Sequence, residues 1–263
     1  MRRFMLLCLM LSLVSTACTK PQDGSGGAKV EGEQSLCGGN PRITGGHACA
    51  DPGSSPVVLL VLADQNGQNF AICSGTLLTS DTILTAAHCV DRSAGIYKVY
   101  VDRSGELDLV PATATFKHPG WTGQAGNPND VGIVKVAQPI ATRSTAAILI
   151  SSSPQINEDI YAYGYGIDEN GDYQVLKEGH MKVSFFAENL IFAEYDRTKS
   201  SICSGDSGGP VTAVRGGGPA IIGINSAVAG ETCLDGSIAA FADIAYESNL
   251  DFIMQHVPDV ETR

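Results

Sequence analysis

Apolar residues recur along the chain in short runs separated by turn residues, which is the pattern of β-strands. Residues 57–63 are rich in leucine and β-branched side chains, Asn66-Gly67 favours a two-residue turn, and an apolar run returns at 70–78. Together they predict an antiparallel hairpin. Further runs follow at similar spacing, at residues 99–101, 131–136, 160–165, 181–186, 211–214 and 220–224.

Only the end of the chain has helical spacing. Ile244, Leu250, Ile253, Met254 and Val257 approximate a stripe with a period of roughly 3.6 residues, which predicts one C-terminal helix. The sequence has no repeat of about 20 to 50 residues, so solenoids and propellers are not expected. The pattern predicts an all-β protein built as barrels or a sandwich.

Length and charge narrow the class. The 263 residues are 43% hydrophobic and 17% charged, which excludes a disordered chain and suffices for one large domain or two small ones. Asp and Glu number 28 against 17 Lys and Arg, giving a net charge of −11. Because this charge repels phosphate, nucleic acid and anionic membrane surfaces are not expected as partners.

The first residues have the form of an export signal. Arg2 and Arg3 precede an apolar run at 4–14 that is too short to span a bilayer as a helix. Small residues at 15–17 suit signal peptidase, so residues 1–17 are the expected signal peptide. The chain is therefore expected to be exported.

Cys18 leaves two fates open after export. It stands where bacterial lipoprotein signals place their acylated cysteine, although Ser15 replaces the usual leucine. Discounting Cys8 in the signal leaves seven cysteines, and lipid on Cys18 would leave six that can all pair. The protein is thus expected to be secreted, or anchored by lipid at Cys18 to the bacterial cell envelope, for example as an outer-membrane lipoprotein.

Three segments carry candidate catalytic residues. His88 lies in TAAHC, Asp130 precedes an apolar run in NDVGIVKV, and Ser207 lies in CSGDSGGP. Taken singly, the histidine is more often structural and the aspartate more often a cap or turn residue. A serine flanked by glycines has an exposed hydroxyl, and the unhindered backbone can direct N–H groups at a developing oxyanion.

In this order, the three motifs resemble those of trypsin/chymotrypsin-like serine proteases, over roughly residues 43–257. The resemblance implies two antiparallel Greek-key β-barrels, at 43–145 and 146–263, with a C-terminal helix. It places the catalytic residues in the cleft between the barrels. A serine endopeptidase acting on protein or peptide substrates is the expected function.

The resemblance also assigns roles. Ser207 corresponds to the nucleophile, His88 to the general base and then acid, and Asp130 to the residue that orients the imidazole. The backbone N–H groups of Gly205 and Ser207 correspond to the oxyanion hole.

The serine motif has a competing interpretation. Residues 205–209 also fit G-x-S-x-G, the nucleophile elbow of α/β-hydrolases, for which His256 could supply the histidine. That elbow needs a helix after the serine, whereas another strand-like run follows Pro210. An α/β-hydrolase is therefore not expected.

Arg42-Ile43 resembles the activation site of the family, where an activating protease cuts after the basic residue. The new amino group of Ile43 would pair with Asp206, because a buried carboxylate needs a cation. The resemblance thus implies a zymogen with residues 18–42 as tether and propeptide. The alternative is that Arg42 is an exposed linker residue.

Six cysteines are expected to pair in an oxidising compartment. The pairs implied by the resemblance are Cys73 with Cys89 and Cys203 with Cys233. Cys37 and Cys49 remain, on either side of Arg42-Ile43. We hypothesise that they pair and hold the propeptide, with any lipid, on the cleaved chain.

The resemblance also suggests a substrate preference. Ser201 falls at the base of the specificity pocket, where trypsins carry an aspartate, so a preference for Arg or Lys is not expected. Ile202 follows, and Ser226 begins a segment that resembles the Ser-Trp-Gly wall. Val228 replaces the glycine and would occlude a large ring. We expect an elastase-like preference for small aliphatic side chains.

The sequence contains no HExxH or paired CxxC motif, so no metal or cofactor is expected. A monomer is expected. A catalytically silent binding protein on the same fold is the alternative function.

Overall fold

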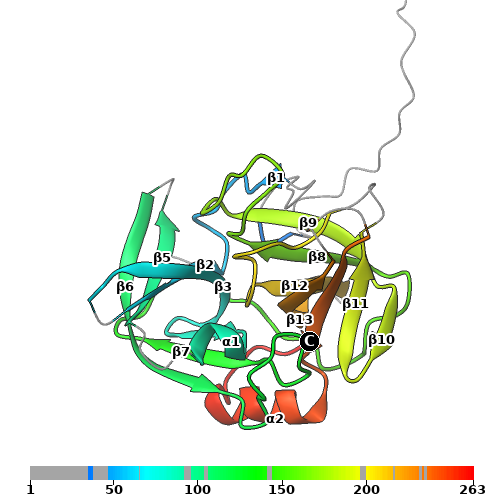
Figure 1. The fold of residues 1–263 in the computed structure, drawn as a ribbon. Helices are drawn as coiled ribbons and strands as arrows, with labels where there is room; N and C mark the ends of the chain where they lie inside the picture. Colours follow the sequence, from blue (N-terminus) through cyan, green and yellow to red (C-terminus); the bar gives the residue numbers. More distant parts are fainter. Residues whose placement is uncertain are drawn as a thin grey trace, which may run out of the picture. The chain divides into compact units, whose positions relative to one another are not determined.

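Two antiparallel sheets, a six-stranded closed barrel and an eight-stranded sheet, form the body of the computed structural model (Figure 1). All described residues belong to one compact unit, Glu31–Arg263. They are residues 35–37, 47–64, 66–91, 96–103, 106–140, 144–195, 200–215, 217–230, 233 and 236–263. The expected signal peptide, Cys18, Arg42 and Ile43 lie outside the described residues.

The closed barrel has the strand order β2-β3-β4-β7-β6-β5. Its strands are β2 (Val57–Ala63), β3 (Asn69–Thr79), β4 (Thr82–Thr85), β5 (Ile96–Arg103), β6 (Glu106–Lys117) and β7 (Gly132–Val136). Residues of β2 are buried on both faces. Alternate side chains of a strand point to opposite faces. Val58, Leu60 and Leu62 join the core that contains the barrel interior, and Val57, Leu59 and Val61 join a core shared with Tyr163 and Tyr165.

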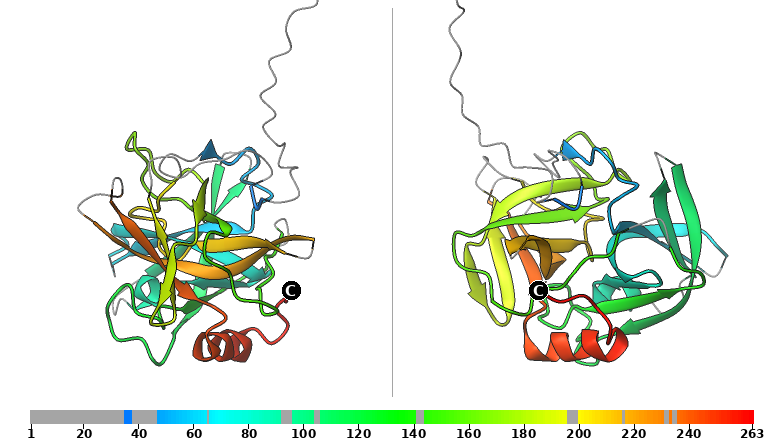
Figure 2. Two further views of the ribbon diagram at one scale, coloured as in Figure 1. Left: turned by 90° about the vertical axis from the view of Figure 1, so that its right-hand side faces the viewer. Right: turned by 180° about the vertical axis from the view of Figure 1, so that it is seen from behind.

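The second sheet has the order β1-β9-β8-β12-β13-β14-β11-β10. Its strands are β1 (His47–Ala48), β8 (Asp159–Gly164), β9 (Lys177–Lys182), β10 (Phe185–Ala187), β11 (Leu190–Glu194), β12 (Pro210–Arg215), β13 (Gly218–Ala229) and β14 (Ile238–Asp243). Only two residues separate β9 from β10 along the chain, although these two strands lie near opposite ends of the strand order of the sheet. The sheet therefore curls back toward itself, as Figure 2 shows.

Two helices complete the described part of the fold, which is the predicted chymotrypsin-like β class with a C-terminal helix. α1 (Ala87–Val90) is a single turn after β4, and α2 (Glu247–His256) lies below both sheets in Figure 1. The predicted helical stripe was wrong at both ends, because α2 ends at His256 and Val257 is its C-cap residue. Ile244 comes directly after β14 and before α2, where its backbone N–H donates to Ile222. Neither helix of the described chain is long and apolar enough to cross a membrane.

Candidate active site

His88 is held by a short, tightly fixed segment. It lies in α1, directly after β4, and the disulfide between Cys73 and Cys89 joins this turn to β3. Its neighbours Ala87 and Cys89 are buried, whereas the His88 side chain keeps 20% of its surface exposed. The imidazole therefore has one protected side and one accessible side.

Asp130 occupies the protected side. Its carboxylate is fully buried and accepts three hydrogen bonds. The His88 N–H donates to Oδ1 at 2.9 Å, the His88 Nδ1–H to Oδ2 at 2.7 Å, and the Ser226 hydroxyl to Oδ2 at 2.5 Å. These bonds compensate for burying the acid. Because Nδ1 carries the hydrogen, Nε2 of the neutral imidazole is an acceptor.

The loop that carries Asp130 is fixed by residues from the other end of the chain. The Gly126 N–H donates to the Ser226 hydroxyl at 2.8 Å, and the Asn249 amide donates to the Pro128 carbonyl at 2.7 Å. Ser226 lies at a register shift between β13 and β14. Bulges of this kind redirect a side chain, here toward Asp130.

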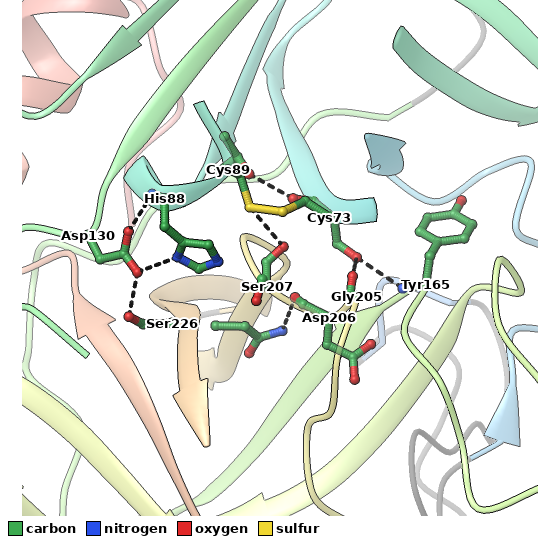
Figure 3. Close-up of a disulfide and its surroundings, with 12 residues drawn as sticks. Cys73, His88, Cys89, Asp130, Tyr165, Gly205, Asp206, Ser207 and Ser226 are labelled. Carbon is green, nitrogen blue, oxygen red and sulfur yellow. Dashed lines mark hydrogen bonds and ion pairs between the residues drawn. A yellow bond between two sulfur atoms is a disulfide. The ribbon is translucent and has the colours of Figure 1, made fainter. Parts of the chain in front are cut away.

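Ser207 lies beyond the imidazole from Asp130, as Figure 3 shows. Among the described residues, no hydrogen bond joins its hydroxyl to His88. Its carbonyl accepts from the Ser74 N–H at 2.7 Å, and the next N–H, of Gly208, donates to Asn225 at 2.8 Å. A Cβ on Gly208 would lie 2.1 Å from the Thr85 hydroxyl, so only glycine permits this approach to the barrel.

Two backbone donors beside Ser207 are free. Within the described chain, neither the Gly205 N–H nor the Ser207 N–H has a hydrogen-bond partner. Unpaired N–H groups are uncommon in a packed site because each forgoes a hydrogen bond. Groups left unpaired next to a serine hydroxyl can stabilise an oxyanion that forms there.

Asp206 points away from Ser207 and is fully buried (Figure 3). Its carboxylate accepts from Gly166 N–H at 2.9 Å and from Cys203 N–H at 2.8 Å. A Cβ on Gly164 or Gly166 would overlap this carboxylate, so both glycines make room for it. Burial raises the pKa of Asp206 to about 7, because the two N–H bonds and the more distant charge of Lys177 offset desolvation only in part.

A cavity of about 250 Å³ opens next to Ser207. Ile202, Ala227, Val228 and the Cys203–Cys233 disulfide contribute to its lining. Two other expected pocket residues lie elsewhere. Ser201 is fully buried with its hydroxyl 3.2 Å from that of Ser237, and Ser226 binds Asp130. Besides Ser207 itself, the lining thus combines apolar side chains with Gly230 and the polar residue Ser204.

The structure contains the three disulfides expected from the sequence, including Cys37–Cys49. Cys73, Cys89 and His88 also form the one cluster of potential metal ligands in the described part of the chain. Both sulfurs are oxidised in a disulfide, and a metal ligand must be a thiolate, so this cluster does not suit a metal.

Comparison with known families gives a match over most of the chain. The family model described as Trypsin matches residues 43–252, which include His88, Asp130 and Ser207. The chain belongs to the trypsin family. It is therefore, by class, a trypsin/chymotrypsin-like serine endopeptidase.

Relatives of this trypsin-family chain are distant. Human chymotrypsin-like elastase family member 1 is 26% identical over 226 residues, covering 74% of the chain and 84% of the relative. Ovochymase of Halocynthia roretzi is 29% identical over 165 residues, or 52% of the chain. Clotting factor C of Tachypleus tridentatus is 30% identical over 188 residues, or 57% of the chain. The matches cover only 10% and 18% of these two larger relatives.

Sequence reasoning missed several residues that build the site of this trypsin-family protease. Asn249, Gly126 and Ser74 were not singled out, and Ser226 was assigned to the pocket wall rather than to Asp130. The available signal was a polar side chain within a strand-like run of the sequence. Ser74 and Ser226 are themselves buried in strands, and a buried hydroxyl needs a partner.

Proposed function

We propose that this chain hydrolyses peptide bonds of protein substrates by a triad of Ser207, His88 and Asp130. The observation that carries the proposal is the buried Asp130 carboxylate on Nδ1 of His88, with Ser207 beyond the ring. This arrangement leaves Nε2 as a base toward the serine.

The reaction follows from these positions. Ser207 Oγ attacks the substrate carbonyl carbon while its proton moves to His88 Nε2, and Asp130 stabilises the resulting imidazolium. The tetrahedral intermediate collapses when His88 protonates the leaving amine, which leaves an acyl group on Ser207. Water then attacks the acyl carbon, giving its proton to His88, and Ser207 leaves with that proton restored.

The free N–H groups of Gly205 and Ser207 are the proposed oxyanion hole. The substrate oxygen becomes negative only in the tetrahedral intermediate, so these donors favour the transition state over the bound substrate. A single donor of this kind is typically worth about 3 to 4 kcal/mol of barrier.

We further propose that cleavage after Arg42 activates the enzyme. Asp206 supports this proposal because its carboxylate is fully buried, accepts two N–H bonds and has its pKa raised to about 7. A new α-amino group on Ile43 would supply the cation for this acid. The pair would fix the backbone of residues 205–207, because Asp206 lies between Gly205 and Ser207.

The segment before the proposed cut would stay attached. Cys37 is fully buried and disulfide-bonded to Cys49, and the Leu36 N–H donates to the Tyr163 hydroxyl at 3.3 Å. The hydroxyl of Ser35 donates to the buried acid Glu178.

Export, a lipid on Cys18 and domain limits at 43–145 and 146–263 remain part of the proposal. The disulfides are typical of proteins in an oxidising compartment.

The test is labelling with a fluorescent fluorophosphonate, which reacts with activated serines. The chain is compared before and after cutting at Arg42, with Ile43 verified as the new N-terminus, and Ser207→Ala is the matched control. We expect labelling of the cut chain, little of the uncut chain, and none of the variant.

Other outcomes separate the parts of the proposal. Equal labelling of both forms would reject activation by cleavage and keep the triad. No labelling of a correctly cut chain would reject the catalytic proposal in favour of a silent binding protein.

The cavity lining predicts the side chain preferred before the scissile bond. The branched side chains of Val228 and Ile202 line the cavity, so we propose a preference for alanine, valine and similar residues. Val228→Gly should raise kcat/KM for a phenylalanine substrate at least about 10-fold relative to an alanine substrate. A peptide library compares the two enzymes, with Val228→Ala as an intermediate control. A parent enzyme that already prefers Phe, Tyr, Arg or Lys would contradict this preference.

A further inference from the structure

Ser74 of β3 joins the closed barrel to the segment that contains Gly205. Its side chain is fully buried, and its hydroxyl has two partners from distant parts of the sequence. It donates to the Gly205 carbonyl at 2.9 Å and accepts from the Tyr165 N–H at 3.0 Å (Figure 3 shows Gly205 and Tyr165). The Ser74 backbone N–H donates to the Ser207 carbonyl at 2.7 Å.

We propose that Ser74 is a positioning residue for the oxyanion hole. Its hydroxyl holds the Gly205 carbonyl and thereby keeps the Gly205 N–H directed at the substrate oxygen. The inference rests on the proposed function, since it needs Gly205 and Ser207 to supply the oxyanion donors.

Gly205 needs such a restraint because its backbone is intrinsically permissive. Its φ is +99°, in the region that glycine enters at little cost and other residues avoid. The peptide before it is held by the Ile167 N–H, which donates to the Ser204 carbonyl at 3.0 Å. On the other side, the Ser74 hydroxyl is the one hydrogen-bond partner of the Gly205 carbonyl among the described residues.

The same hydroxyl also stabilises the segment on the far side of Gly205. Tyr165 is followed by Gly166, whose N–H binds Asp206, and by Ile167, whose N–H binds Ser204. A Cβ on Gly205 would lie 2.9 Å from the Gly166 Cα, so the two segments are in direct contact. Loss of the Ser74 hydroxyl would therefore remove two hydrogen bonds at once, the one to the Gly205 carbonyl and the one from the Tyr165 N–H of the neighbouring segment.

The test compares Ser74→Ala with the parent enzyme after cutting at Arg42. We expect kcat to fall about 10- to 100-fold, with KM for a peptide substrate changed less than about 3-fold. The fall is smaller than for complete loss of an oxyanion donor, because the Gly205 N–H remains but is misdirected.

Thr76→Val is the matched control for the loss of a buried hydroxyl. Thr76 lies two residues further along β3 and is also buried, but its hydroxyl has no hydrogen-bond partner in the described structure. This variant should keep the kcat of the parent within about 2-fold.

A second pair of variants separates the hydroxyl from side-chain shape. Ser74→Thr keeps the hydroxyl and adds a methyl group. Ser74→Val has nearly the shape of the threonine variant but lacks the hydroxyl. The Ser74→Thr enzyme should be at least about 10-fold more active than the Ser74→Val enzyme, even where the added bulk lowers the stability of both variants.

The decisive readout is affinity for a peptidyl trifluoromethyl ketone, which forms a tetrahedral oxyanion on Ser207. Its affinity should fall by the same factor as kcat/KM in each variant, while affinity for the non-covalent product peptide stays constant. A merely structural role would lower thermal stability without this parallel loss.

Parent-like kcat in Ser74→Ala, or equal activities of the threonine and valine variants, would overturn the inference and leave the triad intact. A parent chain that fails to react with fluorophosphonate after verified cutting would instead reject the proposed function, and the positioning role with it.

Discussion

Replacing Ser207 with alanine is expected to lower kcat for a peptide substrate about a million-fold. His88→Ala should have a similar effect, because the serine hydroxyl is a poor nucleophile without a base to take its proton. The two side chains act on one proton transfer. The double variant should therefore be about as active as either single variant, rather than a further million-fold slower.

Asp130→Asn completes this series. An amide on Nδ1 of His88 favours the wrong tautomer, so kcat should fall about 10⁴-fold with little change in the fold. Activity is measured on an aliphatic peptide ester and amide, with mass spectrometry to exclude traces of parent enzyme. Multiplicative losses in the double variant would contradict a triad acting as a unit.

Asp206→Asn should have the next largest effect. In the cut enzyme, the neutral amide cannot pair with the amino group of Ile43, so kcat/KM should fall about 10²- to 10³-fold. Asparagine is close to aspartate in size and fits the space that Gly164 and Gly166 leave. Fluorophosphonate labelling rates of parent and variant, before and after cutting, measure the effect. Equal rates in the two cut enzymes would reject the pairing.

The uncut chain tests the same acid through its pH dependence. Its folded pKa of about 7 is above the ordinary value near 3.8, so between these values the folded state binds more protons than the unfolded state. The stabilising contribution of Asp206 is therefore fully present below the unfolded pKa and is lost as the pH rises through the folded pKa. Relative to Asp206→Asn, the parent should lose about 2 to 4 kcal/mol of unfolding free energy between pH 4 and pH 8.

Denaturant unfolding of both uncut chains at several pH values gives this difference. Glu178, whose pKa burial also raises to about 7, is present in both chains and cancels. A difference that does not vary with pH would contradict a neutral, buried Asp206 in the uncut chain.

The sequence predicted the parts of the fold with strong local signals. The hairpin of β2 and β3 has leucine-rich and β-branched strands around Asn66-Gly67, and the structure pairs them. β6 was not predicted because it mixes charged, proline and apolar residues, with Leu109 and Phe116 exposed. β14 was not predicted because alanine, its commonest residue, favours strands weakly.

In the candidate site, too, the residues with strong local signals were predicted and the others were not. His88, Asp130 and Ser207 stand in motifs that are recognisable over five to eight residues. Ser74, Asn249 and the bulge at Ser226 act across more than 90 residues of sequence, through single hydrogen bonds that no local pattern encodes. α1 was missed because one helical turn has no periodicity to detect.

The burial of Cys37 affects how the protein can be produced. Cys37 packs with Tyr163, Tyr165 and Cys49 in the core between the sheets. A recombinant chain that started at Ile43 would leave Cys49 as an odd thiol beside an apolar void, which favours misfolding and intermolecular disulfides. Production therefore has to begin upstream of Ser35 and to cut at Arg42 only after oxidative folding, so that both fragments remain joined through Cys37.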